Sequence, residues 1–246
     1  MKKTALVTGG AGGIGAAICR KLAQKGLNIV INYLTSETEA FSLCEELKET
    51  YGVNALCIKA DVSNEKNVEK MMDQIRQELG SVDVLVNNAA IDLPDMFYLK
   101  TAEQFRRVLD VNVVGAYICS RKAYEHMKEK RWGRIINITS TNGINTYYPM
   151  CFDYDASKAA LISLTHDLAI QFAPYVNVNA IAPGFIGTKK ELEGYDEEFL
   201  KQETEKILKG RYGKPEEVGD LVAFLIDADY INNTIIRIDG GQMGSC

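Results

Sequence analysis

Thr8-Gly9-Gly10-Ala11-Gly12-Gly13-Ile14-Gly15 stands between an apolar run, residues 4–7, and a helical pattern that starts at Ile14. Glycines at such a junction let backbone amides approach a pyrophosphate at the positive end of the helix. A tight turn without a ligand would use the same residues, so the glycines alone leave both interpretations open. Their position directly after the first strand favours a dinucleotide site.

Short apolar runs of strand length alternate with helical patterns along the rest of the chain. The predicted strands cover residues 4–7, 28–33, 55–59, 82–86, 134–139, 176–181 and 235–238. The predicted helices cover residues 14–25, 37–50, 68–79, 103–130, 157–172 and 215–224. This order predicts an α/β fold with a doubly wound, parallel, seven-stranded sheet and helices on both faces.

Composition limits the class of function. The net charge of −5 argues against a nucleic-acid or membrane partner, because those surfaces favour a basic excess. No linker-like stretch divides the chain, which predicts one domain over residues 1–246. No leader-like segment or apolar run approaching twenty residues is present, so a cytoplasmic location is expected.

The cysteines and histidines indicate neither a disulfide framework nor a metal site. The six cysteines lie far apart, at Cys19, Cys44, Cys57, Cys119, Cys151 and Cys246. Such spacing is typical of reduced thiols, and packing is the expected role of Cys151 as well. His126 and His166 are the only imidazoles, and we predict no metal.

Ser140, Tyr154 and Lys158 carry the main chemical signal. Tyr154 and Lys158 are four residues apart, which places them on one face of a helix. A tyrosine hydroxyl titrates near 10, and a nearby ammonium would favour the phenolate and lower that pKa. Ser140 follows a strand and would hydrogen-bond a substrate oxygen as charge develops. The three residues predict proton transfer to or from a carbonyl oxygen.

Spacing alone does not prove this role. Chance gives about one Tyr-x-x-x-Lys pair in a chain of this composition, and Tyr124 with Lys128 forms a second pair. That pair has no serine-bearing strand end before it and no Pro-Gly loop after it. For Tyr154 the alternative is packing in a groove, with Lys158 as a solvated charge.

Over essentially its whole length the chain resembles the short-chain dehydrogenase/reductase family, and it is most similar to the bacterial 3-oxoacyl-[acyl-carrier-protein] reductases. The residues that carry the resemblance are Thr8, Gly9, Gly13, Gly15, Asn87 to Ala90, Asn112, Ser140, Tyr154, Lys158, Pro183-Gly184 and residues 210–217. The resemblance implies a Rossmann-type fold and an NAD(P)-dependent carbonyl reductase or alcohol dehydrogenase.

The resemblance also implies a set of site residues. The catalytic ones are Asn112, Ser140, Tyr154 and Lys158, with Asn112 holding a water that links Lys158 to solvent. The cofactor-binding ones are Gly9, Gly12, Gly13, Ile14, Gly15, Tyr33, Thr35, Ser36, Asp61, Val62, Asn88, Ala89, Ala90, Tyr154, Lys158, Pro183, Gly184, Ile186 and Thr188.

The end of the second strand bears on the choice of cofactor. NAD enzymes usually carry an acidic residue there for the ribose 2′-hydroxyl, but this chain has Asn32 and Tyr33. Thr35 and Ser36 could donate hydrogen bonds to a 2′-phosphate. NADP(H) is therefore favoured, and NAD(H) stays open.

Several substrates and partners fit the resemblance. A 3-oxoacyl thioester is the first candidate, with an acyl carrier protein as partner, because residues 128–131 resemble half of the basic patch that such reductases offer to the carrier. A sugar, polyol or hydroxysteroid is the alternative, and the aromatic-rich residues 144–153 could form the wall for any bulky ring. Residues 187–210 are the expected substrate lid. The resemblance also implies a homotetramer. A dinucleotide sensor without activity is a further alternative.

Overall fold

Seven parallel strands form one sheet at the centre of the computed structural model, which describes residues 2–244. The strands are β1 (Thr4–Val7), β2 (Asn28–Tyr33), β3 (Ala55–Lys59), β4 (Val84–Asn87), β5 (Gly133–Ile138), β6 (Val176–Pro183) and β7 (Ile235–Ile238). Their order in the sheet is β3-β2-β1-β4-β5-β6-β7. The direction of winding reverses between β1 and β4, and the carboxyl ends of strands at such a reversal open a crevice where ligands bind.

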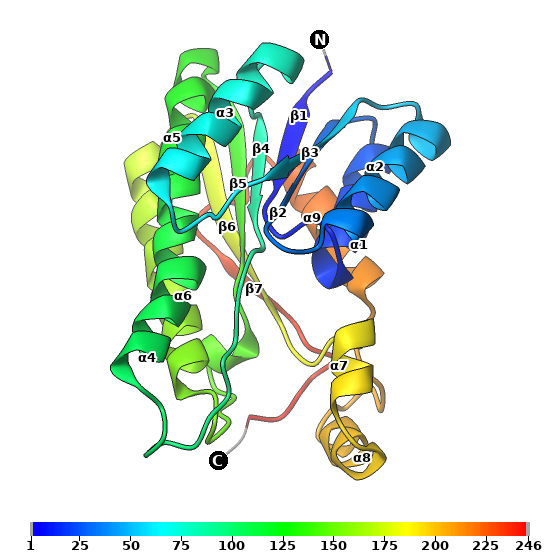
Figure 1. Cartoon of the computed structure of the whole chain (residues 1–246), viewed down its shortest axis with the longest axis vertical. Helices are drawn as coiled ribbons and strands as arrows, with labels where there is room; N and C mark the ends of the chain where they lie inside the picture. The colour runs from blue at the N-terminus through cyan, green and yellow to red at the C-terminus, as the bar shows by residue number, and fades with distance from the viewer. Residues whose placement is uncertain (1, 245–246) are drawn as a thin grey trace.

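Helices cover both faces of the sheet (Figure 1). One face carries α1 (Gly13–Gln24), α2 (Glu37–Tyr51) and α9 (Pro215–Asp227). The other carries α3 (Glu65–Leu79), α5 (Gly115–Lys130) and α6 (Phe152–Phe172). The chain alternates between the two sides, so the predicted doubly wound fold is confirmed.

The strands are apolar throughout because each side chain enters one of two cores. Ala5 and Val7 of β1 pack with α1 and α2, while Leu6 between them packs with α3 and α5. All three side chains are fully buried. A strand buried on both faces cannot use polar residues at alternate positions, which explains the continuous apolar runs of the sequence.

The predicted helix over residues 103–130 is interrupted. It consists of α4 (Ala102–Leu109), a wide π-helical turn at Asp110–Val114, and α5. The wide turn contains Asn112, whose side chain bonds to the segment that follows β4. Gly115, where the turn ends, lies so close to Val62 that a Cβ atom would be 2.8 Å from its Cγ2. Such turns often mark functional positions in helices.

Two further elements differ from the sequence prediction. Helix α6 begins at Phe152 rather than at residue 157, so Tyr154 lies in its first turn. The expected lid contains two helices, α7 (Lys189–Gly194) and α8 (Glu197–Glu205), separated by Tyr195 and Asp196. Both lie beyond the carboxyl ends of the strands, at the end of the molecule opposite the N-terminus (Figure 1).

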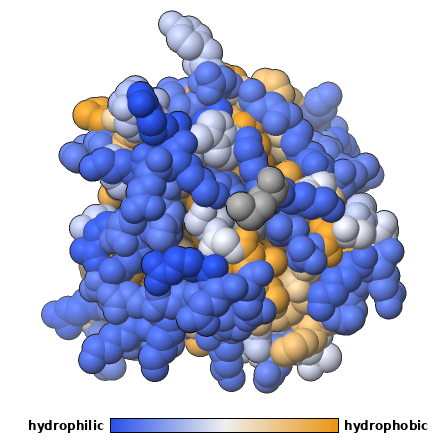
Figure 2. All heavy atoms as spheres, turned by 90° about the horizontal axis from the view of Figure 1, so that it is seen from above, coloured by the Kyte–Doolittle hydropathy of each residue, from blue (hydrophilic) through white to orange (hydrophobic). Residues whose placement is uncertain are grey.

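The two ends of the sheet carry different parts of the chain. Figure 2 views the end at which β1 begins, where hydrophilic side chains cover most of the face and apolar residues are scattered. The carboxyl ends of the strands lie at the other end, with α7 and α8. Among residues 2–244, no helix is both long and apolar enough to cross a membrane.

Candidate active site

Two positions of the glycine loop after β1, Gly9 and Gly15, are packed too tightly for a side chain. Gly9 has a φ of +59°, and a Cβ atom there would lie 2.9 Å from the Cα of Ala89. A Cβ atom on Gly15 would lie 2.3 Å from the carbonyl oxygen of Gly9. Gly12, in contrast, faces open space and caps the amino end of α1 without a side-chain bond. The loop therefore presents backbone at a helix amino end, the arrangement that suits a pyrophosphate.

Thr8 and Asn88 hold this loop against the end of β4. The Thr8 hydroxyl oxygen accepts hydrogen bonds from the backbone amides of Asn88 and Ala89, both at 3.0 Å. The Asn88 side-chain amide donates in return to the carbonyl oxygens of Thr8 and Gly9, also at 3.0 Å. The loop and the Asn87-Asn88-Ala89-Ala90 segment thus form one unit across the reversal of the sheet.

A cavity of about 650 Å³ opens at the carboxyl end of the sheet and collects many of the predicted residues. Those that line it are Ile14, Asn88, Ala90, Ser140, Tyr154, Lys158, Pro183, Gly184, Ile186 and Thr188. They come from the glycine loop, the ends of β4, β5 and β6, and α6. Gly13 lies beside the cavity, because its Cβ position is 3.3 Å from Thr188.

Tyr154 and Ser140 both line this cavity, and their side chains are hydrogen-bonded to each other. Burial raises the pKa of Tyr154, the charge of Asp92 raises it further, and a hydrogen bond with Ser140 acts to lower it. We expected the nearby Lys158 ammonium to bring this pKa below its usual value, but the net shift is upward. Tyr154 is half-buried near several carboxylates, and their combined effect with burial is a pKa above the usual value.

Lys158 is almost fully buried, with 2% of its surface exposed. Its ammonium donates a hydrogen bond of 2.9 Å to the carbonyl oxygen of Ile138 and lies 5.3 Å from the centre of the Tyr154 ring. Burial lowers the pKa of Lys158 to about 8. The ammonium is therefore mostly charged at neutral pH and titrates in a range where an enzyme could use it.

Asn112 joins three parts of the site. Its side-chain oxygen accepts from the backbone amide of Ile91 (2.8 Å), and its amide donates to the carbonyl oxygen of Ile91 (2.9 Å) and to the Ser157 hydroxyl (3.0 Å). Both amide hydrogens are thus used within the protein. The side chain fixes the segment after β4 against α6, one residue from Lys158.

The residues predicted for the adenosine half lie at the ends of β2 and β3. Tyr33 is buried and its hydroxyl donates to Glu37 at 3.3 Å, while Thr35 and Ser36 are exposed. Asp61 accepts from Ser63 and Arg107, and these bonds outweigh burial and lower its pKa. The Val62 side chain, next to Asp61, is buried against Gly115.

Several cavity residues were not predicted from the sequence. Asp92 and Glu191 line the cavity, and burial raises the pKa of each. The aromatic wall includes Tyr148, as expected, but Phe185, Tyr195 and Phe199 complete it from the lid side. Phe185 and Phe199 lie 6.4 Å apart by ring centres. No local motif marks these residues, because they meet only in the folded chain.

Comparison with known proteins decides the family. The short chain dehydrogenase family matches residues 3–197. A 3-oxoacyl-[acyl-carrier-protein] reductase of Aquifex aeolicus is 37% identical over 98% of this chain and 97% of its own length. The chain belongs to the short-chain dehydrogenases/reductases. It is an oxidoreductase that acts on CH–OH and C=O groups, and the family in general binds NAD(P)(H).

Other members of the family share the fold but differ in substrate by name. Glucose 1-dehydrogenase 2 of Bacillus subtilis is 34% identical over 98% of this chain and 94% of its own length. The crystal structure of acetoin dehydrogenase YohF from Salmonella typhimurium superposes with a TM-score of 0.89 at 35% identity, covering 99% of this chain and 96% of that one. The relatives therefore show the reaction type and leave the substrate open.

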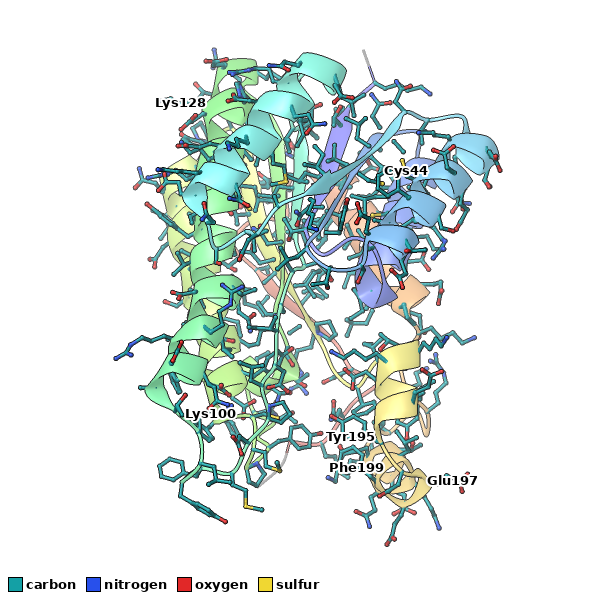
Figure 3. All side chains as sticks on the ribbon, in the orientation of Figure 1. Cys44, Lys100, Lys128, Tyr195, Glu197 and Phe199 are labelled. Atoms are coloured by element: carbon teal, nitrogen blue, oxygen red, sulfur yellow. The ribbon has the colours of Figure 1, made fainter. Side chains whose placement is uncertain are left out.

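The basic stretch at residues 128–131 lies far from the cavity of this short-chain dehydrogenase/reductase. Figure 3 places Lys128 at the end of the molecule opposite Tyr195 and Phe199 of the lid side. The neighbouring Lys130 is paired with Asp83 at 2.6 Å. The basic stretch and the lid side of the cavity thus lie at opposite ends of the chain.

The cysteines and candidate metal ligands add no further chemistry. The thiols of Cys19, Cys44, Cys57, Cys119 and Cys151 are all free, and Cys246 lies outside the described residues. Burial raises the pKa of Cys151 to about 12. Within residues 2–244, no group of three His, Cys, Asp or Glu side chains is arranged to hold a metal ion.

Proposed function

We propose that the enzyme transfers hydride between a nicotinamide cofactor and a ketone or secondary alcohol, with Tyr154 as proton donor or acceptor. One observation carries this proposal: Ser140, Tyr154 and Lys158 line the same cavity as Ile14 and Thr188 beside the glycine loop. A bound nicotinamide supplies or accepts the hydride. The residues of the chain then hold the substrate oxygen and move its proton.

In the reduction, Tyr154 gives its proton to the substrate oxygen. The phenol is protonated at neutral pH, because its pKa lies above the usual value near 10, so a proton is present to be given. Ser140 would hydrogen-bond the same oxygen while negative charge develops on it. The Lys158 ammonium, 5.3 Å from the ring, stabilises the phenolate that forms. Oxidation runs the same steps backwards and should need a higher pH.

A 3-oxoacyl thioester is the first candidate substrate. It is supported by the similarity to 3-oxoacyl-[acyl-carrier-protein] reductases and by the aromatic wall of Tyr148, Phe185, Tyr195 and Phe199. The carrier protein as partner has weaker support, because the basic stretch at residues 128–131 lies at the far end of the chain. A carrier there would have to serve the cavity of a neighbouring subunit.

A hydroxyl-bearing substrate such as a sugar or polyol is the second candidate, and one observation favours it. Asp92 and Glu191 bring two carboxylates to the cavity, and both charges act on Tyr154. Carboxylates accept hydrogen bonds from hydroxyl groups and repel anionic substrates. The similarity to glucose 1-dehydrogenase 2 supports the same candidate.

NADP(H) is the proposed cofactor. The support is that the end of β2 offers Asn32 and Tyr33 instead of a carboxylate, and that the Ser36 side chain makes no capping bond to α2. Glu37 accepts from Tyr33 close by and would oppose a 2′-phosphate if it turned toward it.

Four expectations from the sequence stay predictions. They are the homotetramer, the cytoplasmic location, the single domain and the lid at residues 187–210.

Tyr154→Phe tests the reaction. Oxidation of NADPH and NADH at 340 nm would be followed with acetoacetyl-CoA, a panel of keto-sugars and a ketosteroid. We expect turnover with NADPH to fall about 10²–10⁴-fold in the variant, while cofactor binding measured by fluorescence is kept. Tyr124→Phe is the control, because the Tyr124 ring stacks on Phe172 at 3.9 Å, away from the cavity. Equal turnover in both variants would overturn the proposal.

A further inference from the structure

Besides its bond with Tyr154, the Ser140 hydroxyl makes two hydrogen bonds with Asn142. It donates to the Asn142 side-chain oxygen at 3.1 Å and accepts from the Asn142 backbone amide, also at 3.1 Å. A serine hydroxyl has one proton and two lone pairs. These two bonds use the proton and one lone pair, so the other lone pair is left for the Tyr154 hydroxyl or a substrate.

The orientation of the Asn142 amide is set by a carboxylate. Its nitrogen donates to Asp155 at 2.7 Å. Asp155 is buried, with 8% of its surface exposed, and its second oxygen accepts from the backbone amide of Tyr148 at 3.4 Å. Turning the Asn142 amide over would place its oxygen against the carboxylate. The amide oxygen must therefore face Ser140.

We propose that Asn142 and Asp155 are positioning residues for Ser140 that control the direction of its hydroxyl proton. The inference rests on the function proposed above. While Tyr154 is a phenol, it donates to the free lone pair of Ser140, and the serine proton stays on Asn142. When charge develops on Tyr154 or on the substrate oxygen, the hydroxyl turns and donates to that oxygen. The charged acceptor wins because hydrogen bonds to charged groups are about twice as strong as neutral ones.

Asp155 also acts on Tyr154 through its charge. The carboxylates that raise the pKa of Tyr154, after burial, are Asp92 from the segment following β4, Glu191 from α7 and Asp155 from α6. The one cation close to the ring is Lys158, among the residues that the structure describes. Removing the charge of Asp155 therefore has two effects: it weakens the bond that orients the Asn142 amide, and it lowers the pKa of Tyr154.

Asp155→Asn separates this role from simple support of the fold. Its control is Asp167→Asn, which removes an equal charge from the exposed face of the same helix about 18 Å away. The probe is whichever compound of the panel above the wild type turns over fastest, assayed in both directions across pH. We expect kcat to fall about tenfold with KM changed less than about twofold, and the pH midpoint of oxidation to move lower. Asp167→Asn should match the wild type.

A second pair of variants tests whether a lower kcat of Asp155→Asn results from misfolding. Asn142→Asp sets two carboxylates against each other and should lower kcat further. Asn142→Asp with Asp155→Asn restores a donor and an acceptor in reversed order and should recover kcat about tenfold over Asn142→Asp. Kinetics and pH midpoints of Asp155→Asn equal to those of Asp167→Asn would overturn the positioning role alone. A wild type that turns over no probe would overturn the proposed function and this inference with it.

Discussion

Lys158 is a charge that the fold buries at a cost, so Lys158→Met should stabilise the protein while it abolishes activity. Burial lowers the pKa of Lys158 from 10.5 to about 8. At 1.36 kcal/mol per pKa unit, holding the ammonium in the folded state costs roughly 3 kcal/mol at neutral pH. Methionine removes this penalty and leaves the Ile138 carbonyl without its donor, which costs about 1–2 kcal/mol. The net gain in unfolding free energy should be about 1–2 kcal/mol.

The difference in unfolding free energy between the wild type and Lys158→Met should change with pH in a defined direction. The folded pKa of Lys158 lies below the unfolded value, so the unfolded chain binds more protons between about pH 8 and 10.5. The stability contribution of the lysine therefore rises with pH across that window. Between pH 7 and 9.5 the wild type should gain about 2 kcal/mol relative to Lys158→Met. The lost bond to Ile138 cancels from this difference, because it is the same at every pH.

Urea unfolding at pH 7, 8, 9 and 9.5 measures the difference. The fluorescence of Trp132, the only tryptophan, reports the transition. Protein concentration and ionic strength must be held fixed, because assembly of subunits would also stabilise the fold. Lys128→Met is the control, since Lys128 is exposed on α5 and its loss should change stability by less than about 0.5 kcal/mol. A constant gap between wild type and Lys158→Met across this pH range would refute the reasoning.

Two further predictions, each with a matched control, concern the packing around the site. Gly15→Ala should weaken cofactor binding at least about tenfold, because its Cβ atom would lie 2.3 Å from the Gly9 oxygen and 2.7 Å from the Asn88 amide. Gly194→Ala, whose Cβ atom meets nothing within 4 Å, should bind cofactor as the wild type does. Lys100→Met should lower the free energy of unfolding by about 3–5 kcal/mol in a urea titration, because it leaves the fully buried Asp153 without its partner at 2.7 Å. Lys100→Met with Asp153→Leu should recover most of that loss, and no recovery would show that the ion pair is not the cause.

The fold could be predicted because its signals are local. Each strand is an apolar run bounded by glycine or polar residues, and each helix shows its own period, so one window of sequence is enough for each. The prediction of one continuous helix over residues 103–130 was wrong because the interruption depends on contacts that are not local. The interruption depends on Asn112 bonding to Ile91 and on Gly115 packing against Val62, both distant in sequence. The hydrophobic periodicity of the sequence does not predict contacts between residues so far apart in the chain.

The residues of the candidate site also differ in whether local sequence was enough to predict them. Tyr154 and Lys158 could be found because one helix turn brings them together, and Ser140 because it follows a strand. The direction of the Tyr154 pKa could not be found, since it depends on burial and on Asp92, a residue 62 positions earlier in the chain. The residues proposed for proton transfer were thus visible in the sequence, and the carboxylates that shift the pKa of Tyr154 were not.

The substrate should depend on residues that lie outside the motifs shared with the family. The residues shared with the relatives can explain only the reaction that the relatives share. Asp92, Glu191 and Asn142 line the cavity, and Asp155 is bonded to Asn142. None of these four residues belongs to the motifs that carried the resemblance. Three carboxylates near one phenol favour a substrate that donates hydrogen bonds, and they make an anionic substrate costly to bind. The walls of the cavity, rather than its catalytic residues, should therefore decide between the thioester and the polyol.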